Sequence, residues 1–310
     1  MSDAYLMAYF ISEDDVDGEQ VRFAVSAADD PRRWTPLSGG RPVLTSSVGE
    51  RGVRDPFLLW DAPRERYVLL ATDLRVAADG DWTRAVRSGS RSIVVWESAD
   101  LVRWTPPALR EVAPPGAGNA WAPKAFRDDA RGVWTVIWAS SLQGIGSDHQ
   151  RLLAADTVDF ARFSESRVYL DPGHDVIDAT FLRAGNDWFR FSANAQAPGA
   201  PAHIGHHIFV ERGTALSDPA YTPVAIDVGR PELVRGEGPA VFQSADQRMS
   251  YLLIDEFALR GYQLFELETE HLASGEWRHV PDAVLPPGAR HGSVIPLSAA
   301  RAAALRRALP

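Results

Sequence analysis

A strand followed by a polar turn and an aromatic residue recurs five times along this chain of 310 residues. The aromatic residues that end the five copies are Trp34, Trp104, Phe163, Tyr221 and Trp277. Successive members of this series lie 70, 59, 58 and 56 residues apart. Self-similarity at a nearly fixed period is the signature of a repeat architecture, and it constrains the fold more than any local motif does.

Each copy contains further strands. A second apolar strand precedes each repeat strand, at 5–10, 67–72, 133–139, 188–192 and 251–254. Another strand begins each unit, at 55–59, 122–126, 178–182, 239–242 and 293–297. We expect a fourth, outer strand after each aromatic turn. Four strands in each of five units predict an all-β fold, a five-bladed β-propeller.

The phase of the repeat predicts how the ring closes. The chain begins at the second strand of a unit and ends with a lone first strand. The last blade should therefore combine both termini, with residues 1–45 and 289–298 joined by pairing of the N-terminal strands with the C-terminal strand. The tail 299–309, rich in Ala, Leu and Arg, predicts a short surface helix. No composition shift marks a linker, so we expect residues 1–310 to form one domain.

Composition excludes several classes of function. The formal charge of −9 and the lack of a basic run argue against a nucleic-acid partner. No stretch resembles a membrane span or a signal peptide, so we expect a cytoplasmic chain without a membrane partner. The absence of cysteine excludes disulfides, thiolate metal sites and a cysteine nucleophile. The oligomeric state is not indicated.

Three units carry an acidic residue where the first strand begins: Asp55, Asp178 and Glu237, the last between Gly236 and Gly238. We interpret these as matching positions of the repeat. The first strand of each propeller blade lines the central channel. The three carboxylates should therefore converge at one end of the channel, although 123 and 59 residues separate them along the chain.

Five segments, spread over most of the chain and in the same order, resemble family 43 of the glycoside hydrolases, which includes arabinofuranosidases, arabinanases and xylosidases. They are residues 53–57, 119–123, 176–180, 236–239 and 290–296. One departure is Lys124, where many members of the family carry an acidic residue. This departure loosens the subfamily assignment and does not touch the three acids.

The resemblance implies a role for each acid in hydrolysis with inversion. Asp55 would be the general base and Glu237 the general acid, while Asp178 would orient Glu237 and raise its pKa. Inverting hydrolysis needs one protonated and one ionised carboxyl group, separated by roughly 6.5 to 9.5 Å. A like charge beside an acid favours its protonated form, which suits these roles.

Other residues of the five segments are candidates for binding substrate. Trp121 should present its ring to a sugar, and we expect Asn119 and Phe57 to contribute to the same pocket. Arg290 could bind a carboxylate or a sugar hydroxyl. His291 is either a polar plug of the channel or, as the resemblance implies, a residue beside a structural calcium ion or its water. The hydrolysis itself requires no cofactor and no metal.

Three further segments of the sequence lie outside these motifs. His203, His206 and His207 lie in a segment rich in Pro, Gly and Ala, and we predict solvated loop residues rather than metal ligands. The acidic segment 12–19 predicts a surface turn. The long insertion 73–90, which holds Asp73, Asp81 and Trp82, is expected to wall the pocket and to select the sugar.

We hypothesise an inverting exo-glycoside hydrolase that releases terminal furanose residues from an oligosaccharide or glycoside, with α-L-arabinofuranose as the first candidate. A β-xylosidase or a β-D-galactofuranosidase would use the same machinery. A non-catalytic carbohydrate-binding propeller is the alternative from another class. A fructose-transferring enzyme is a third, since Arg54-Asp55-Pro56 resembles a motif of that group, but the Asn-Asp-Pro-type segment of its nucleophile is missing near the start.

Overall fold

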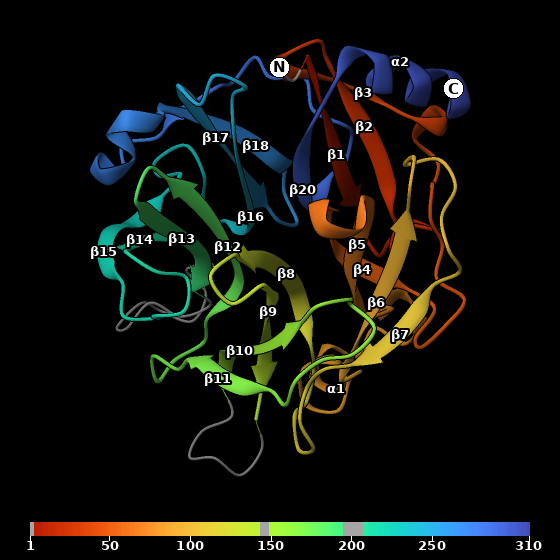
Figure 1. Cartoon of the computed structure of the whole chain (residues 1–310), viewed down its shortest axis with the longest axis vertical. Helices are drawn as coiled ribbons and strands as arrows, with labels where there is room; N and C mark the ends of the chain where they lie inside the picture. The colour runs from red at the N-terminus through yellow and green to blue at the C-terminus, as the bar shows by residue number, and fades with distance from the viewer. Residues whose placement is uncertain (1–2, 143–148, 195–206) are drawn as a thin grey trace.

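The computed structural model describes residues 3–142, 149–194 and 207–310. Within these ranges the strands form five four-stranded antiparallel sheets, arranged as blades around a central channel (Figure 1). The predicted five-bladed β-propeller is therefore confirmed.

The strands repeat in one order, from the channel outward. The innermost strands are β4 (Val53–Asp61), β8 (Trp121–Asp128), β12 (Ile177–Ala184), β16 (Glu237–Gln243) and β20 (Arg290–Leu297). The second strands are β5 (Arg66–Asp73), β9 (Val133–Ser141), β13 (Asp187–Asn194), β17 (Met249–Glu256) and β1 (Ala4–Phe10). The third strands are β6 (Ser92–Ser98), β10 (Gln150–Thr157), β14 (His207–Gly213), β18 (Gly261–Glu268) and β2 (Arg22–Ala27). The outer strands are β7 (Ala108–Glu111), β11 (Arg167–Leu170), β15 (Thr222–Val228), β19 (Arg278–His279) and β3 (Asp30–Pro36).

The ring closes through β20 and β1, as the phase of the repeat predicted. These two strands pair antiparallel, with Met7 opposite Val294, and Figure 1 shows the blue strand beside the red one. One detail of the repeat was wrong. In four blades the aromatic residue precedes the outer strand, but in the closing blade Trp34 lies inside β3.

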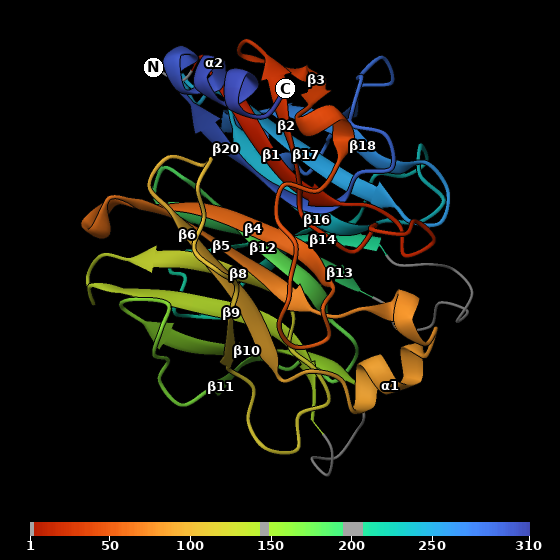
Figure 2. The ribbon, with the colours of Figure 1, turned by 90° about the vertical axis from the view of Figure 1, so that its right-hand side faces the viewer.

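The helices are short and lie outside the blades. α1 (Trp82–Arg87) belongs to the insertion between β5 and β6, and α2 (Ala299–Ala308) is the predicted C-terminal helix. The two helices lie far apart in both views (Figures 1 and 2). Short 3-10 helices occur at η1 (Ser38–Gly40), η2 (Ala62–Arg64), η3 (Val76–Ala78) and η4 (Thr269–Ser274). No helix in the described part of the chain is long and apolar enough to cross a membrane.

The core lies between neighbouring blades. The second and third strands carry apolar side chains on both faces, so each blade packs against the next. One such layer joins Leu70 and Val95 of one blade to Trp138 of the next, all at most 4% exposed. Burying one large apolar side chain contributes about 1.5–3 kcal/mol. These layers fix the blades, and with them the five inner strands that line the channel.

Candidate active site

All five inner strands share one backbone irregularity near their first residues. The pairing of each inner strand with its neighbour shifts there. The residues that adopt a positive φ at this point are Asp55, Ala122, Asp178, Gly238 and His291. A β-bulge of this kind redirects a side chain and is common beside active sites. The repeated bulge therefore brings five equivalent positions to one level of the channel.

The bulge corrects the interpretation that the three acids occupy matching positions. Asp55 and Asp178 do occupy the same position of two blades, but Glu237 lies one residue earlier. The bulge position of its blade is Gly238, with φ 55°. A Cβ atom on Gly238 would lie 2.4 Å from Cδ2 of His291. Glycine is required here because the imidazole needs that space.

The imidazole of His291 is the point where the acids meet. Its Nδ1 lies 2.9 Å from Oδ1 of Asp55 and 3.7 Å from Oδ2 of Asp178. Its Nε2 lies 2.9 Å from Oε1 of Glu237 and 3.1 Å from Oδ2 of Asp255. Burial lowers the pKa of His291, but the surrounding carboxylates outweigh burial and raise it well above its usual value. The ring is therefore a cation that donates to acids on both sides.

Asp55 is held as a carboxylate. Burial opposes its ionised form, but the hydrogen bond and charge of His291, with Arg54 and Lys124, lower the pKa of Asp55 to about 2. The hydroxyl of Thr72, in the neighbouring strand β5, also donates to Oδ2 at 2.5 Å. A buried carboxylate with so low a pKa is charged at any working pH, as a general base must be.

Asp178 has the opposite tendency. Burial and the nearby charges of Asp55 and Glu237 raise the pKa of Asp178 to about 6, although His291 and Lys124 oppose them. Its Oδ2 accepts a hydrogen bond from the backbone N–H of Gly238 at 3.0 Å, directly after Glu237. The carboxyl group beside the predicted acid thus keeps a proton into the mildly acidic range.

Glu237 is oriented by two cations. Its Oε1 accepts from Arg290 at 3.0 Å as well as from His291. Arg290 is shared, because its Nε donates to Asp255 at 2.7 Å and its Nη1 lies 3.3 Å from Glu13. The structure therefore places Arg290 against carboxylates of the protein itself.

Asp255 was not found by sequence reasoning. It is fully buried in β17, opposite Glu237 in the strand pairing. The signal available in the sequence was an acidic residue at the end of an apolar strand, because the end of a second strand meets the start of its inner strand.

Lys124 is also buried, and its ammonium nitrogen lies 5.5 Å from the ring centre of Phe57. Burial lowers the pKa of Lys124.

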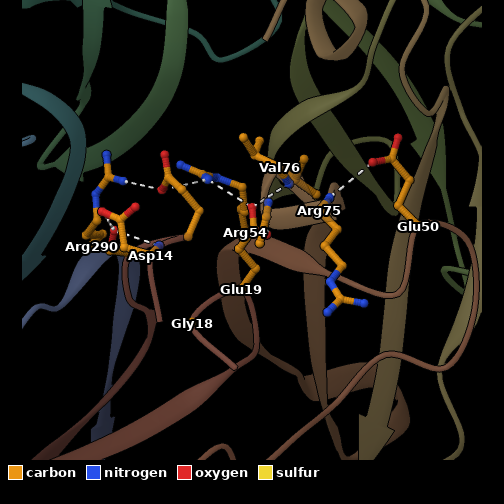
Figure 3. A network of polar contacts seen from close by, with 12 residues as sticks. Asp14, Gly18, Glu19, Glu50, Arg54, Arg75, Val76 and Arg290 are labelled. Carbon is orange, nitrogen blue, oxygen red and sulfur yellow. Dashed lines mark hydrogen bonds and ion pairs between the residues drawn. The ribbon is translucent and has the colours of Figure 1, made fainter. Parts of the chain in front are cut away.

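The acidic segment 12–19 is more than the predicted surface turn. Glu19 is buried and accepts hydrogen bonds from Arg54 and from the backbone N–H groups of Val76 and Ala77. Glu13 reaches both Arg54 and Arg290. Figure 3 shows this chain of contacts, which runs from Arg290 through Arg54 to the insertion. The prediction failed because these acids pair with arginines that are distant in the sequence, Arg54 in β4 and Arg290 in β20.

The remaining candidates for binding substrate lie in different surroundings. Trp121 is half-buried, one residue before the bulge of β8, and its ring packs edge-on against Trp82. Asn119 is fully buried, and its amide bonds Ser141 and Gln150 within the protein. Its side chain supports the loop instead of facing a substrate.

Phe57 lies past the bulge of its strand and lines a different part of the channel. Its ring packs against Phe126, with ring centres 5.7 Å apart. With other residues from the later parts of the inner strands it borders a hollow of about 460 Å³. The predicted contact of Phe57 with a sugar at the acids is therefore not supported by its place in the fold.

Comparison with known proteins identifies the family of this chain. A family model described as a probable glycosyl hydrolase domain, related to glycosyl hydrolase family 43, matches residues 1–303. The chain belongs to this family. The resemblance to family 43 that the five sequence segments indicated is thereby confirmed.

A curated relative of this family 43-related domain is an alpha-L-arabinofuranosidase of Bifidobacterium longum subsp. longum. It is 31% identical over 222 residues, which are 65% of this chain and 21% of the relative. The chain thus spans about a fifth of the length of that protein.

Solved structures share the fold. A thermostable family-43 glycoside hydrolase superposes with a TM-score of 0.56 at 18% identity, covering 80% of each chain. An alpha-L-arabinofuranosidase from Lactobacillus brevis gives 0.56 at 17%, covering 77% of this chain and 74% of that one. A family 43 β-1,3-galactosidase gives 0.61 at 12%, covering 91% and 57%. At these identities the likeness shows the propeller fold.

The predicted calcium ion stays a prediction for this family 43-related domain. Among the described residues, both buried groups of His, Asp and Glu atoms close enough to hold a metal include His291. Both of its ring nitrogens already bond carboxylates, and calcium prefers oxygen ligands. The donor set as it stands therefore does not fit a calcium ion.

Of the three histidines that we predicted to be solvated loop residues, the structure describes only His207. His203 and His206 lie outside the described residues. His207 begins β14, where it is buried, with Nδ1 3.0 Å from Asp227. The prediction of a solvated loop residue was wrong for His207, because pairing with β13 draws it into the sheet.

Proposed function

We propose that this chain is a glycoside hydrolase that releases a terminal furanose with inversion of configuration, with α-L-arabinofuranose as the first candidate. One observation carries the proposal. Asp55, Asp178 and Glu237, from three different blades, all reach the imidazole of His291. Of these, Asp55 is held ionised, while a proton is retained at Asp178 beside Glu237. Glycoside hydrolysis requires one ionised and one protonated carboxyl group, the roles that we assign to Asp55 and Glu237.

Asp55 would activate water. In the proposed step the carboxylate takes a proton from a water molecule, and the water oxygen forms a bond to the anomeric carbon. The glycosidic bond to the leaving oxygen breaks at the same time, and Glu237 donates a proton to that oxygen. Attack and departure occur on opposite faces of the sugar, so the configuration inverts. General acid and base each contribute about 10² to 10⁴ in rate.

His291 and Asp178 would support these two groups. Asp55 and Glu237 contact different nitrogens of the same imidazole, each at 2.9 Å, so the ring lies between them. This spacing favours the wider separation of inverting enzymes, roughly 6.5 to 9.5 Å, over the 5 to 5.5 Å of retaining ones. The charge of Glu237 raises the pKa of Asp178, and this interaction is reciprocal, so the two carboxyl groups titrate as a coupled pair.

The choice of sugar rests on relatives. The curated relative from Bifidobacterium longum is named an alpha-L-arabinofuranosidase, as are several structural neighbours. The acids are at most 9% exposed, which suits a pocket that admits a single terminal sugar. We therefore favour exo action on an arabinofuranosyl oligosaccharide or side chain.

A panel of nitrophenyl glycosides tests the proposal: α-L-arabinofuranoside, β-D-xyloside and β-D-galactofuranoside, each with wild type and with Glu237→Gln. We expect release from the arabinofuranoside by wild type. On α-1,5-L-arabinotriose, whose leaving group is a sugar hydroxyl, Glu237→Gln should lose at least a hundredfold in rate. Proton NMR of the first-formed anomer should show inversion. Release of nitrophenol only from the xyloside or the galactofuranoside would mean that the enzyme is specific for that sugar. Binding of oligosaccharides without hydrolysis of any glycoside would mean a non-catalytic propeller.

A further inference from the structure

We propose that Trp82, in the insertion between β5 and β6, is a platform on which a second sugar unit of the substrate stacks, beside the end of the channel where the acids lie. This inference rests on the proposed function, since it assumes a glycan substrate. It assigns a binding role to one residue and commits to an oligosaccharide whose second sugar ring presents an apolar face.

The position of Trp82 follows from two contacts to the inner strands. Its ring centre lies 6.2 Å from that of Trp121, and the guanidinium carbon of Arg54 lies 5.0 Å from its ring centre. Trp121 and Arg54 both occupy the residue before the bulge, the position that Glu237 has in its own blade. Trp82 therefore lies at the end of the channel where the acids lie.

Trp82 is exposed where its partners are not. It is 43% exposed, whereas Arg54 is 4% exposed and the acids are at most 9% exposed. Trp121 packs against the apolar interior of the insertion, formed by Leu74, Val76 and Ala85. A large ring left open at the rim of a buried polar site is suited to the apolar face of a sugar that remains outside the pocket.

The insertion is held in place by two carboxylates, Glu19 from the segment before β2 and Glu50 from the segment before β4. Glu19 accepts from the N–H groups of Val76 and Ala77, and Glu50 accepts from the N–H of Arg75. Glu50 also binds the guanidinium of Arg84 with both oxygens, inside α1 (Figure 3 shows Glu19 and Glu50). A platform fixed before binding loses little conformational freedom when the sugar arrives.

The chain offers a matched control. Trp60 is 41% exposed, nearly the same as Trp82, but it lies near the end of β4, where it packs on Tyr67 and borders the hollow at Phe57. Trp60→Ala removes an equally exposed indole from a place away from the acids. Trp82→Phe keeps an aromatic face at the proposed platform.

The test compares these variants on α-1,5-L-arabinotriose and on methyl α-L-arabinofuranoside, which has no second sugar. For Trp82→Ala we expect KM for the triose to rise about tenfold with kcat within about twofold, since stacking of this kind is worth about one power of ten in affinity. The methyl glycoside should be hydrolysed as by wild type. Trp60→Ala should match wild type on both, and Trp82→Phe should keep most of the affinity.

Calorimetric binding of the triose in a Glu237→Gln background separates this inference from the proposed function. If wild type binds the triose without hydrolysing it, the proposed function fails, and the loss of binding in Trp82→Ala still decides the role of Trp82. In the Glu237→Gln background, equal affinity for the triose with and without Trp82→Ala, at equal melting temperatures, would overturn the inference. A wild-type protein that binds no triose would overturn both.

Discussion

Asp55 and Asp178 occupy the same bulge position of two inner strands, with φ of 54° and 56°, and both are 6% exposed. Their pKa values nevertheless move apart, to about 2 for Asp55 and about 6 for Asp178. The same backbone conformation and the same burial thus accompany pKa shifts in opposite directions. The difference must come from what the two neighbouring regions present to each carboxylate.

The second strand of each blade supplies part of that difference. In the strand pairing, Thr72 lies opposite the residue before Asp55, and Ala193 lies opposite the residue before Asp178. Thr72 donates its hydroxyl to Asp55, whereas alanine has nothing to donate. Nδ1 of His291 is also within hydrogen-bond distance of Asp55, at 2.9 Å, but lies 3.7 Å from Asp178. The repeat brings the carboxylates together, and the neighbouring side chains decide which one is charged.

The largest loss of activity should follow from replacing Asp55, the aspartate with the lower pKa. Asp55→Asn should lower kcat/KM roughly 10³-fold, because the proposed mechanism uses the Asp55 carboxylate to take the proton from the attacking water. Asp178→Asn should cost less, because Asp178 acts through Glu237. Initial rates on the best glycoside of the panel, with circular dichroism as the check of folding, measure both. Activity of Asp55→Asn within tenfold of wild type would contradict the assignment of the base.

The repeat made the fold predictable. Each blade uses the same order of strands, and its apolar residues are local in sequence, so strand positions and ring closure could be inferred without coordinates. The convergence of Asp55, Asp178 and Glu237 followed from the same regularity. The helix at 299–308 was predictable from its composition.

The finer arrangement of the site was not predictable, because it depends on strand register. Glu237 lies one residue before the bulge at Gly238, whereas Asp55 and Asp178 are themselves bulge residues, and no glycine marks their bulges in the sequence. Asp255 and Thr72 act across that register from second strands. Glu19 is buried only because Arg54 and the insertion meet it from another blade.

The free energy of unfolding should depend on pH in opposite ways through Asp178 and Asp55. Asp178 has a folded pKa of about 6, above the usual 3.8, so its favourable contribution is complete below pH 4 and is lost as pH rises through 6. Asp55 has a folded pKa of about 2, so its contribution is present above pH 4 and is lost as pH falls through 2. A shift of this size corresponds to roughly 2 to 3 kcal/mol.

Asp178→Asn should therefore be more stable than wild type at pH 7.5, by about 3 kcal/mol, and nearly equal to it near pH 4. Asp55→Asn should be less stable than wild type at pH 7.5, by a similar amount. Urea unfolding at the two pH values measures these differences, provided that the slopes agree among the proteins. Destabilisation of both variants at pH 7.5 would show that the two carboxylates are held alike.

The smallest effect isolates the second strand. Thr72→Val keeps the shape of the side chain but removes the hydroxyl that donates to Asp55 and accepts from the N–H of Ala122. Losing one hydrogen bond to a carboxylate costs about 1.5 kcal/mol, which corresponds to about one pH unit in the pKa of Asp55. The acid limb of kcat/KM should move up by that amount, while the alkaline limb stays in place. Thr135→Val is the control, since Thr135 donates to Asp156, outside the site. An unmoved acid limb in Thr72→Val would leave His291, rather than the second strand, as the source of the contrast between Asp55 and Asp178.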